Sequence, residues 1–143
     1  MSFESAFGAL NIAASGLSAE RLRMEVVANN IANASATRTP EGGPYRRRDV
    51  VFETVLDGVQ SNGDQKLGGV RVAGLVADPS ELPRVFQPGH PDADGEGFVS
   101  MPNVQLPVEM VNLITASRAY EANLRVAQSF LELSQSALAL TRG

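Results

Sequence analysis

The chain has 143 residues, a hydrophobic fraction of 43% and a formal net charge of −4 at pH 7. This length is typical of a single domain, and the acidic balance argues against a nucleic-acid-binding protein, which normally carries a basic surface. The absence of cysteine excludes disulfides and thiolate chemistry, and the single histidine, His90, excludes a pair of histidine ligands within one chain.

No segment reaches the roughly 18 apolar residues that span a membrane, so direct membrane insertion is not expected. The first charged residue is Glu4, which is negative, so the sequence lacks the basic leader of a secretory signal peptide. We therefore expect either cytoplasmic residence or export by a route that does not cleave the chain. Composition does not separate these two.

Residues 1–33 contain no proline and predict one long helix. Large apolar residues recur in it every seven positions: Phe3, Leu10, Leu17, Met24 and Ile31. A second row, mostly alanine, follows three or four positions later. Heptad spacing predicts a seam against another helix, although a core helix of a globular domain explains it equally well. Gly8 and Gly16 each weaken a helix by about 1 kcal/mol relative to alanine, so we expect order only when the helix is packed.

The end of this helix, residues 28–33, reads Ala-Asn-Asn-Ile-Ala-Asn and so holds three asparagines in five positions. Asn29 and Asn33 are one turn apart on the same face. Buried amides need hydrogen-bond partners and would set the register of a seam. Exposed amides would simply end the helix. The hexapeptide itself leaves both interpretations open.

The middle of the chain concentrates the helix-breaking residues, since residues 34–106 hold seven of the eight prolines and ten of the thirteen glycines. Apolar residues within 49–59 and 67–77 predict two strands, and the Asn62–Gly63 pair between them predicts a hairpin turn. The one basic cluster, residues 46–48, precedes Asp49 and is interpreted as a solvated strand edge. Val85 and Phe86 predict a further short strand.

Residues 87–103 are predicted to be a long loop, and they hold the only chemically dense group: His90, Asp92, Asp94 and Glu96. A calcium loop needs glycine at its sixth position and a bidentate glutamate at its twelfth. Counted from Asp92, the glycine falls at the fourth position and the twelfth is Asn103. We therefore favour turn chemistry and predict no metal, no cofactor and no catalytic residues. A small metal-dependent enzyme using residues 90–96 is the least favoured alternative.

Residues 107–143 predict a second long helix, with Pro107 suited to its first turn. Its stripe alternates steps of three and four: Met110, Leu113, Ser117, Tyr120, Leu124, Ala127, Leu131, Ser134 and Leu138. Further apolar residues widen the stripe, so the helix is expected to touch more than one neighbour. At 1.5 Å per residue it spans roughly 50 Å, which suits antiparallel pairing with the first helix.

These segments predict a mainly α fold with a small β part. The two helices, residues 1–35 and 107–143, are expected to pair as an antiparallel axial coiled coil. Residues 36–106 are expected to form a Gly/Pro-rich linking segment with short strands. This segment is too small for a large independent core.

Four motifs resemble a known family. Residues 28–33, and residues 110–123 (Met-Val-Asn-Leu-Ile-Thr-Ala-Ser-Arg-Ala-Tyr-Glu-Ala-Asn), resemble the two signatures of bacterial flagellar rod and hook proteins. Residues 43–53, and residues 88–104 around His-Pro-Asp-Ala-Asp, resemble the proximal-rod members. The resemblance covers nearly the whole chain. The Asn-Asn-Ile-Ala-Asn motif alone marks only the wider family, and the short length fits members without an extra domain.

The resemblance implies a structural subunit of the flagellar proximal rod, not an enzyme, that is required for motility. It implies polymerisation with copies of itself and with other rod proteins, transmission of torque and formation of the export channel. It also implies a periplasmic position in the basal body, close to the inner-membrane ring and rod adaptor region. The subunit would arrive there through the flagellar type III export apparatus without a cleaved signal peptide.

We expect one set of residues to form the assembly faces: Leu10, Leu17, Met24, Asn29, Asn30, Ile31, Asn33, Met110, Leu113, Tyr120, Asn123, Leu124 and Leu131. Related subunits present a Phe-x-x-x-apolar element to the export gate. Phe52 and Leu56 match that spacing, although an ordinary strand explains them equally well. A non-flagellar helical adaptor or scaffold remains the alternative function, but it would not explain the specific motifs of the middle segment.

Overall fold

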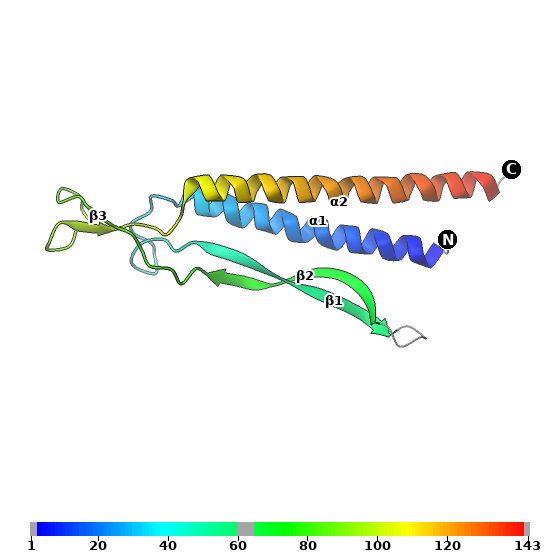
Figure 1. Cartoon of the computed structure of the whole chain (residues 1–143), viewed down its shortest axis with the longest axis horizontal. Helices are drawn as coiled ribbons and strands as arrows, with labels where there is room; N and C mark the ends of the chain where they lie inside the picture. Colours follow the sequence, from blue (N-terminus) through cyan, green and yellow to red (C-terminus); the bar gives the residue numbers. More distant parts are fainter. Residues whose placement is uncertain (1–2, 60–64, 142–143) are drawn as a thin grey trace. The chain divides into compact units, whose positions relative to one another are not determined.

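The computed structural model describes residues 3–59 and 65–141. Its elements, shown in Figure 1, are α1 (Phe3–Ala32), β1 (Arg48–Val59), β2 (Gln65–Ala77), β3 (Arg84–Phe86), β4 (Phe98–Ser100) and α2 (Leu106–Thr141). The expected class, mainly α with a small β part, is confirmed. None of the helices among these described residues has the length and apolar character needed to cross a membrane.

The chain divides into two compact units, and both helices contribute to each. Unit 1 combines Met1–Leu22, Val51–Gly74 and Thr115–Gly143. It therefore holds most of β1 and β2, the N-terminal part of α1 and the C-terminal part of α2. Unit 2 combines Arg23–Val50 and Leu75–Ile114. The end of α1 and the start of α2 therefore belong to unit 2, together with β3 and β4.

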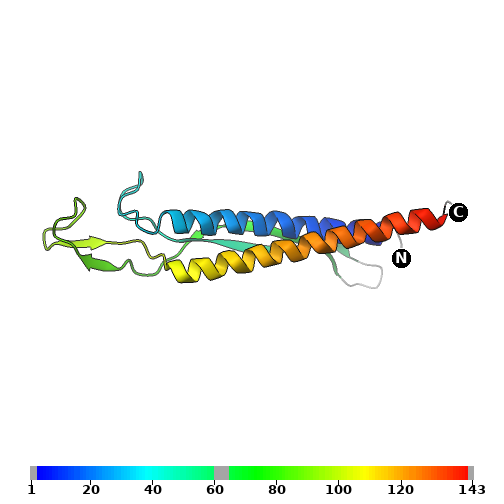
Figure 2. The ribbon, with the colours of Figure 1, turned by 90° about the horizontal axis from the view of Figure 1, so that it is seen from above.

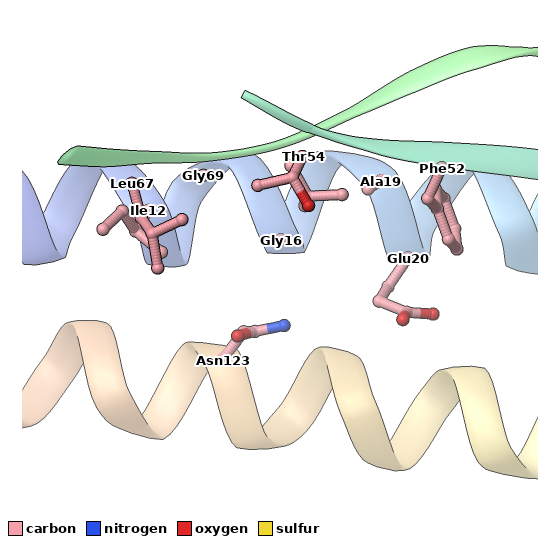
Figure 3. Close-up of a pocket in the computed structure, with 10 residues that line it drawn as sticks. Ile12, Gly16, Ala19, Glu20, Phe52, Thr54, Leu67, Gly69 and Asn123 are labelled. Carbon is pink, nitrogen blue, oxygen red and sulfur yellow. The ribbon is translucent and has the colours of Figure 1, made fainter. Parts of the chain in front are cut away.

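In unit 1, α1 lies between the β1–β2 sheet on one side and α2 on the other (Figures 1 and 3). The two helices run side by side in opposite directions (Figures 1 and 2). β1 and β2 are hydrogen-bonded neighbours and also run in opposite directions (Figure 1), which confirms the strands predicted at 49–59 and 67–77. The predicted Asn62–Gly63 turn lies outside the described residues.

The sheet approaches α1 closely at Ser15. Its hydroxyl accepts a hydrogen bond from the Val70 N–H at 3.1 Å and donates one to the Ile12 carbonyl at 2.6 Å. Gly69 makes this approach possible: its φ is +118°, and a Cβ there would lie 2.3 Å from the Ser15 oxygen. Glycine is the residue that tolerates such a conformation without steric cost.

Small residues also mediate the contact between α1 and α2 in unit 1. Ala13 and Ala116 are buried, and a Cβ on Gly16 would lie 2.8 Å from the amide nitrogen of Asn123. The Asn123 side chain points toward α1 at Gly16 (Figure 3). The glycine that weakens an isolated helix is therefore a site where a side chain of α2 approaches α1 closely.

The expectation of one continuous loop over residues 87–103 is wrong at residues 98–100, which form β4. This strand pairs antiparallel with β3, with Val85 opposite Val99 and Phe86 opposite Phe98. Val99 is fully buried, and the rings of Phe86 and Phe98 make an edge contact with centroids 5.2 Å apart. Three residues are too few to show strand alternation. The Asp and Gly residues on either side favour a loop, and β4 was therefore not predicted.

We predict that Gly97→Ala destabilises unit 2, because Gly97 has a φ of +84° and a Cβ there would lie 2.9 Å from the Phe86 ring. A left-handed backbone costs an alanine about 1–2 kcal/mol, and the clash would disturb the Phe86–Phe98 contact as well. The measurement is the free energy of unfolding in urea. Gly95→Ala is the matched control, since a Cβ at Gly95 meets nothing within 4 Å. Equal losses in both variants would contradict this account.

Candidate assembly interface

A fully buried amide lies at the centre of unit 2. Asn30 is 0% exposed. Its nitrogen donates to the Glu109 carboxylate at 2.9 Å and to the Arg48 carbonyl at 2.8 Å. Its oxygen accepts from the Tyr45 hydroxyl at 2.8 Å and from the Arg48 N–H at 3.0 Å. An asparagine amide offers two donors and two lone pairs, so every hydrogen-bonding position of Asn30 is used.

The carboxylate facing Asn30 is just as enclosed. Glu109, in the first turn of α2, is 1% exposed. Its second oxygen accepts from Arg47 Nε at 2.7 Å and from the Asn112 amide at 3.2 Å. Burial lowers the pKa of Arg47, but the hydrogen bonds and charges of Glu109 and Asp49 together outweigh burial and leave that pKa above its ordinary value. Arg47 and Glu109 therefore form an ion pair, and Arg47 Nη1 also binds Asp49 at 3.2 Å.

The cluster reaches the segment after β2 through Asn103. The Asn103 oxygen accepts from the Arg47 backbone N–H at 2.8 Å, and its nitrogen donates to the Asp78 carbonyl at 3.2 Å and to the Ser80 hydroxyl at 2.9 Å. Burial raises the pKa of the Tyr45 phenol, which keeps this group a hydrogen-bond donor to Asn30. The end of α1, residues 45–48 and the start of α2 are thus tied through side chains of one polar cluster, Asn30, Tyr45, Arg47, Asn103 and Glu109.

Both interpretations of the asparagine-rich hexapeptide hold, but for different residues. Asn30 is buried and joins α1 to α2. Asn29 is exposed, and the Asn33 amide donates to the Asn29 carbonyl at 2.9 Å and to its side-chain oxygen at 3.0 Å. Asn33 therefore satisfies a carbonyl at the end of α1, as expected at a helix C-terminus.

Sequence reasoning missed Glu109 and Arg47. The interpretation of residues 46–48 as a solvated strand edge is wrong for Arg47, whose side chain is only 18% exposed. The available signal was Glu109 itself, the one charge within the apolar stretch Leu106–Ile114. A lone charge in such a stretch needs a buried partner, and Arg47 provides it.

The acidic loop acts as a structural element of unit 2. The Asp92 carboxylate accepts from the Thr37 hydroxyl at 2.8 Å and pairs with Arg38 at 3.2 Å. The Asp94 carboxylate accepts from the backbone N–H groups of Glu96 and Phe98, both at 2.9 Å. Among the described residues, no three His, Asp or Glu side chains come together as a metal site would require. Turn chemistry, as predicted from the sequence, is present at Asp94, whereas Asp92 ties the loop to Thr37 and Arg38.

The structure places the expected assembly residues of α1 in different environments. Leu10, Leu17, Met24 and Ile31 are half-buried along one stripe. Asn30 lies in the polar cluster, Asn33 is half-buried and Asn29 is exposed. Four heptad residues thus keep part of their surface available, while Asn30 has none.

On α2, one row of the expected stripe turns inward and the other does not. Leu113 and Tyr120 are half-buried, as is Asn123, whereas Met110, Leu124 and Leu131 are exposed. The positions that face the chain's own elements are one residue earlier, at Glu109, Ala116, Asn123 and Phe130. Small and polar side chains allow close helix packing there, so the larger apolar row is left outside.

A groove of about 290 Å³ opens in unit 1, where α1, the hairpin and α2 meet (Figure 3). Its lining includes Gly16 and Ala19 of α1 and Gly69 of β2. Ile12 and Leu67 lie together at one end, and Phe52 lies near Glu20 at the other (Figure 3). The candidate export residue Phe52 is therefore half-buried in a groove wall, whereas Leu56 is exposed.

We predict that Asn30→Asp costs about 3–5 kcal/mol of unfolding free energy, the scale of a broken buried charge pair. The change is isosteric but replaces the donor that lies 2.9 Å from the Glu109 carboxylate with a second anionic oxygen. Adding Glu109→Gln supplies a donor again, so the double variant should recover part of the loss. Urea unfolding of all four proteins gives the coupling energy. A coupling near zero would contradict the role given to this contact.

We predict that the Asp94 turn loosens in acid. Hydrogen bonds from the backbone N–H groups of Phe98 and Glu96, together with Arg84, hold the pKa of Asp94 below its ordinary value of 3.8. A depressed carboxyl pKa gives stability that is present above the unfolded value and is lost as pH falls toward the folded value. The protection factor of the Phe98 amide, which is its exchange rate by NMR relative to the intrinsic rate at each pH, should therefore fall below about pH 4. In Asp94→Asn this step should vanish, and a step that persists would assign it to another group.

Two family models match the chain. Residues 96–140 match the C-terminal family of flagellar basal body rod FlgEFG proteins, and residues 10–38 match the flagella basal body rod protein family. These two stretches contain the end of α1, with Asn30, and most of α2, with Glu109. The matched regions thus include both helical partners of the polar cluster.

Curated relatives cover almost the full chain. Flagellar basal-body rod protein FlgC of Borreliella burgdorferi is 45% identical over 96% of this chain and 98% of its own length. The FlgC proteins of Yersinia enterocolitica and Bacillus subtilis are 46% and 40% identical over 91% and 83% of this chain, and over 93% and 87% of their own lengths. These matches confirm the resemblance found in the sequence motifs. The chain belongs to the FlgC family of flagellar basal-body rod proteins, which are structural proteins and not enzymes.

Proposed function

We propose that this chain is a subunit of the proximal rod that polymerises through its terminal helices, transmits torque and contributes to the wall of the export channel. Family membership supports the rod assignment. The observation that carries the polymerisation step is the apolar surface of α2, which the chain's own elements leave exposed.

The first turns of α2 are especially apolar on the outside. Five large side chains there are between 46% and 62% exposed: Leu106, Val108, Met110, Val111 and Ile114. Large apolar side chains left exposed together on successive turns favour an interaction site. Glu109 is held in the polar cluster, and these five side chains lie on the sides of α2 that the described residues of unit 2 leave exposed.

Assembly and stiffness follow from the same surface. A head-to-tail contact that does not close into a ring generates an open helical polymer. Sliding one subunit past another would expose apolar area again at about 25 cal/mol per Å². A rod held by such contacts resists twisting, because every displacement carries this cost in several interfaces at once.

The proposal includes the partners and the location that the resemblance implies. The partners are copies of this chain, other rod proteins, the inner-membrane ring and rod adaptor region, and the type III export apparatus. The location is the periplasmic part of the basal body. The export element of the proposal is Phe52 with Leu56, and an ordinary strand is the alternative. Leu56 is exposed, whereas Phe52 is half-buried beside the groove.

We predict that Ile114→Asp abolishes rod assembly without unfolding the chain, since Ile114 is 59% exposed and a charge there would need to be desolvated in the interface. The measurement is motility and electron microscopy of basal bodies in a strain that lacks the gene and carries either variant in trans. Ala122→Asp, at an exposed position of α2 where the surface is polar, is the matched control and should restore rods.

The strain without the complementing gene tests the proposal itself. Flagella that stop at the inner-membrane ring support a proximal-rod subunit. A motile strain with normal rods would overturn the proposal and favour the helical adaptor. Normal rods with Ile114→Asp would remove this face of α2 from the interface.

A further inference from the structure

The segment between β3 and β4 contains consecutive turns that are closed by backbone hydrogen bonds. The Ala93 N–H donates to the His90 carbonyl at 3.0 Å, and the Gly97 N–H donates to the Asp94 carbonyl at 2.9 Å. His90 is therefore the first residue of one turn, and Asp94 is the first residue of the next.

The side chains of these two first residues act alike. The Asp94 carboxylate accepts a hydrogen bond from the N–H of Glu96, two residues later, at 2.9 Å. In the same way His90 Nδ1 accepts a hydrogen bond from the Asp92 N–H at 3.0 Å. Asp and Asn are the residues that ordinarily hold this position, because their side chains bond the backbone two residues on. The His90 turn instead uses an imidazole, which changes its charge between about pH 5 and 8.

The residue held by His90 joins two segments of unit 2. The Asp92 carboxylate accepts from the Thr37 hydroxyl at 2.8 Å and pairs with Arg38 at 3.2 Å. Pro91 limits the backbone freedom between His90 and Asp92, since proline holds φ near about −65°. Asp92 is thus fixed on both sides, by His90 through its N–H and by the segment after α1 through its carboxylate.

We propose that His90 is a pH-sensitive switch of unit 2: the neutral imidazole holds Asp92 against Thr37 and Arg38, and protonation of the imidazole releases this contact. A neutral imidazole has one accepting nitrogen, whereas an imidazolium has two donors and no acceptor. The Asp92 N–H therefore loses its partner on protonation. The unfolded chain has no such bond to lose, so the stability that it adds is present above the titration range of imidazole and is lost as pH falls through it.

The charged side chains joined to this loop do not cancel the effect. They form two groups: Asp92 with Arg38, and Asp94 and Glu96 with Arg84 of β3. The Asp92 carboxylate attracts an imidazolium, but it is already bound by Arg38 and has to leave that partner in order to pair with His90. Protonation therefore weakens the contact with Arg38 by either route. The switch belongs to the subunit itself and does not depend on the rod assignment.

The direct test is the scalar coupling that an N–H···N hydrogen bond transmits between its two nitrogens, measured by NMR on the isotope-labelled full chain. The coupling between the Asp92 amide nitrogen and His90 Nδ1 should be present at about pH 8 and absent at about pH 5.5, on either side of the imidazole titration. A missing coupling at the higher pH, or one that persists beside a protonated ring, overturns the switch.

The release of the Asp92 carboxylate is tested by a double-mutant cycle of Thr37→Val and Asp92→Ala, followed by urea unfolding. At about pH 8 the coupling should change the unfolding equilibrium constant about tenfold, as for a hydrogen bond to a charged group. Near pH 5.5 it should be about twofold, since one lost neutral hydrogen bond changes an equilibrium about fivefold. Carboxyl groups ordinarily remain ionised at about pH 5.5, so titration of Asp92 does not produce this change.

His90→Asn is the matched variant for the cycle. Asparagine keeps an acceptor for the N–H two residues on but does not titrate in this range, so the coupling between positions 37 and 92 should be equal at both pH values. The step assigned to Asp94 lies below about pH 4 and stays outside the window. A pH effect that survives in His90→Asn belongs to another group and overturns the proposal. So does a Thr37–Asp92 coupling that is unchanged in the wild-type chain after the N–H···N bond is lost.

Discussion

The hydrogen bond between Asn30 and Glu109 is the contact on which the arrangement of unit 2 depends. It joins the end of α1 to the start of α2 through two side chains that are both fully enclosed. Because each also binds residues 45–48, shifting either helix by one residue would break hydrogen bonds of a buried amide and of a buried carboxylate. Such losses cost about 1–3 kcal/mol per neutral group and more per charge. The polar cluster therefore specifies the register of the two helices, because only one register satisfies its hydrogen bonds.

Unit 1 relies on close approach instead of buried charge. Gly16 admits the Asn123 amide, and Gly69 admits the Ser15 hydroxyl, at distances that a Cβ would forbid. Gly16 and Asn30 are two heptads apart on α1, and Asn123 and Glu109 are two heptads apart on α2, the spacing expected along one heptad seam. Each unit therefore contains an asparagine where the helices meet. In unit 2, Asn30 is hydrogen-bonded to Glu109, and in unit 1, Asn123 packs against Gly16.

The sequence predicted both helices and the two long strands, because each shows its periodicity over many residues. It did not predict β4, whose three residues are too short for a pattern. Periodicity placed Met110, Leu124 and Leu131 on the expected assembly faces, but it did not predict that Glu109, Ala116 and Asn123 form the row that lies against the chain's own elements. Packing between helices rewards small residues and satisfied polar groups, and neither property follows from hydrophobic spacing alone. Arg47 became interpretable only once its distant partner was known.

The difference between the side chains used inside the subunit and those left exposed connects its fold to the proposed assembly. Polar and small side chains occupy the internal contacts and select one arrangement, but they contribute little hydrophobic stabilisation. The leucines and the apolar start of α2 remain outside, where burial requires a neighbour. Anything that binds only the ordered state stabilises it by mass action, so each docked neighbour also stabilises the helices that it contacts. In the polymer proposed above, such a subunit would be held more firmly than alone, because large apolar side chains that the chain leaves exposed on α2 would be buried between molecules.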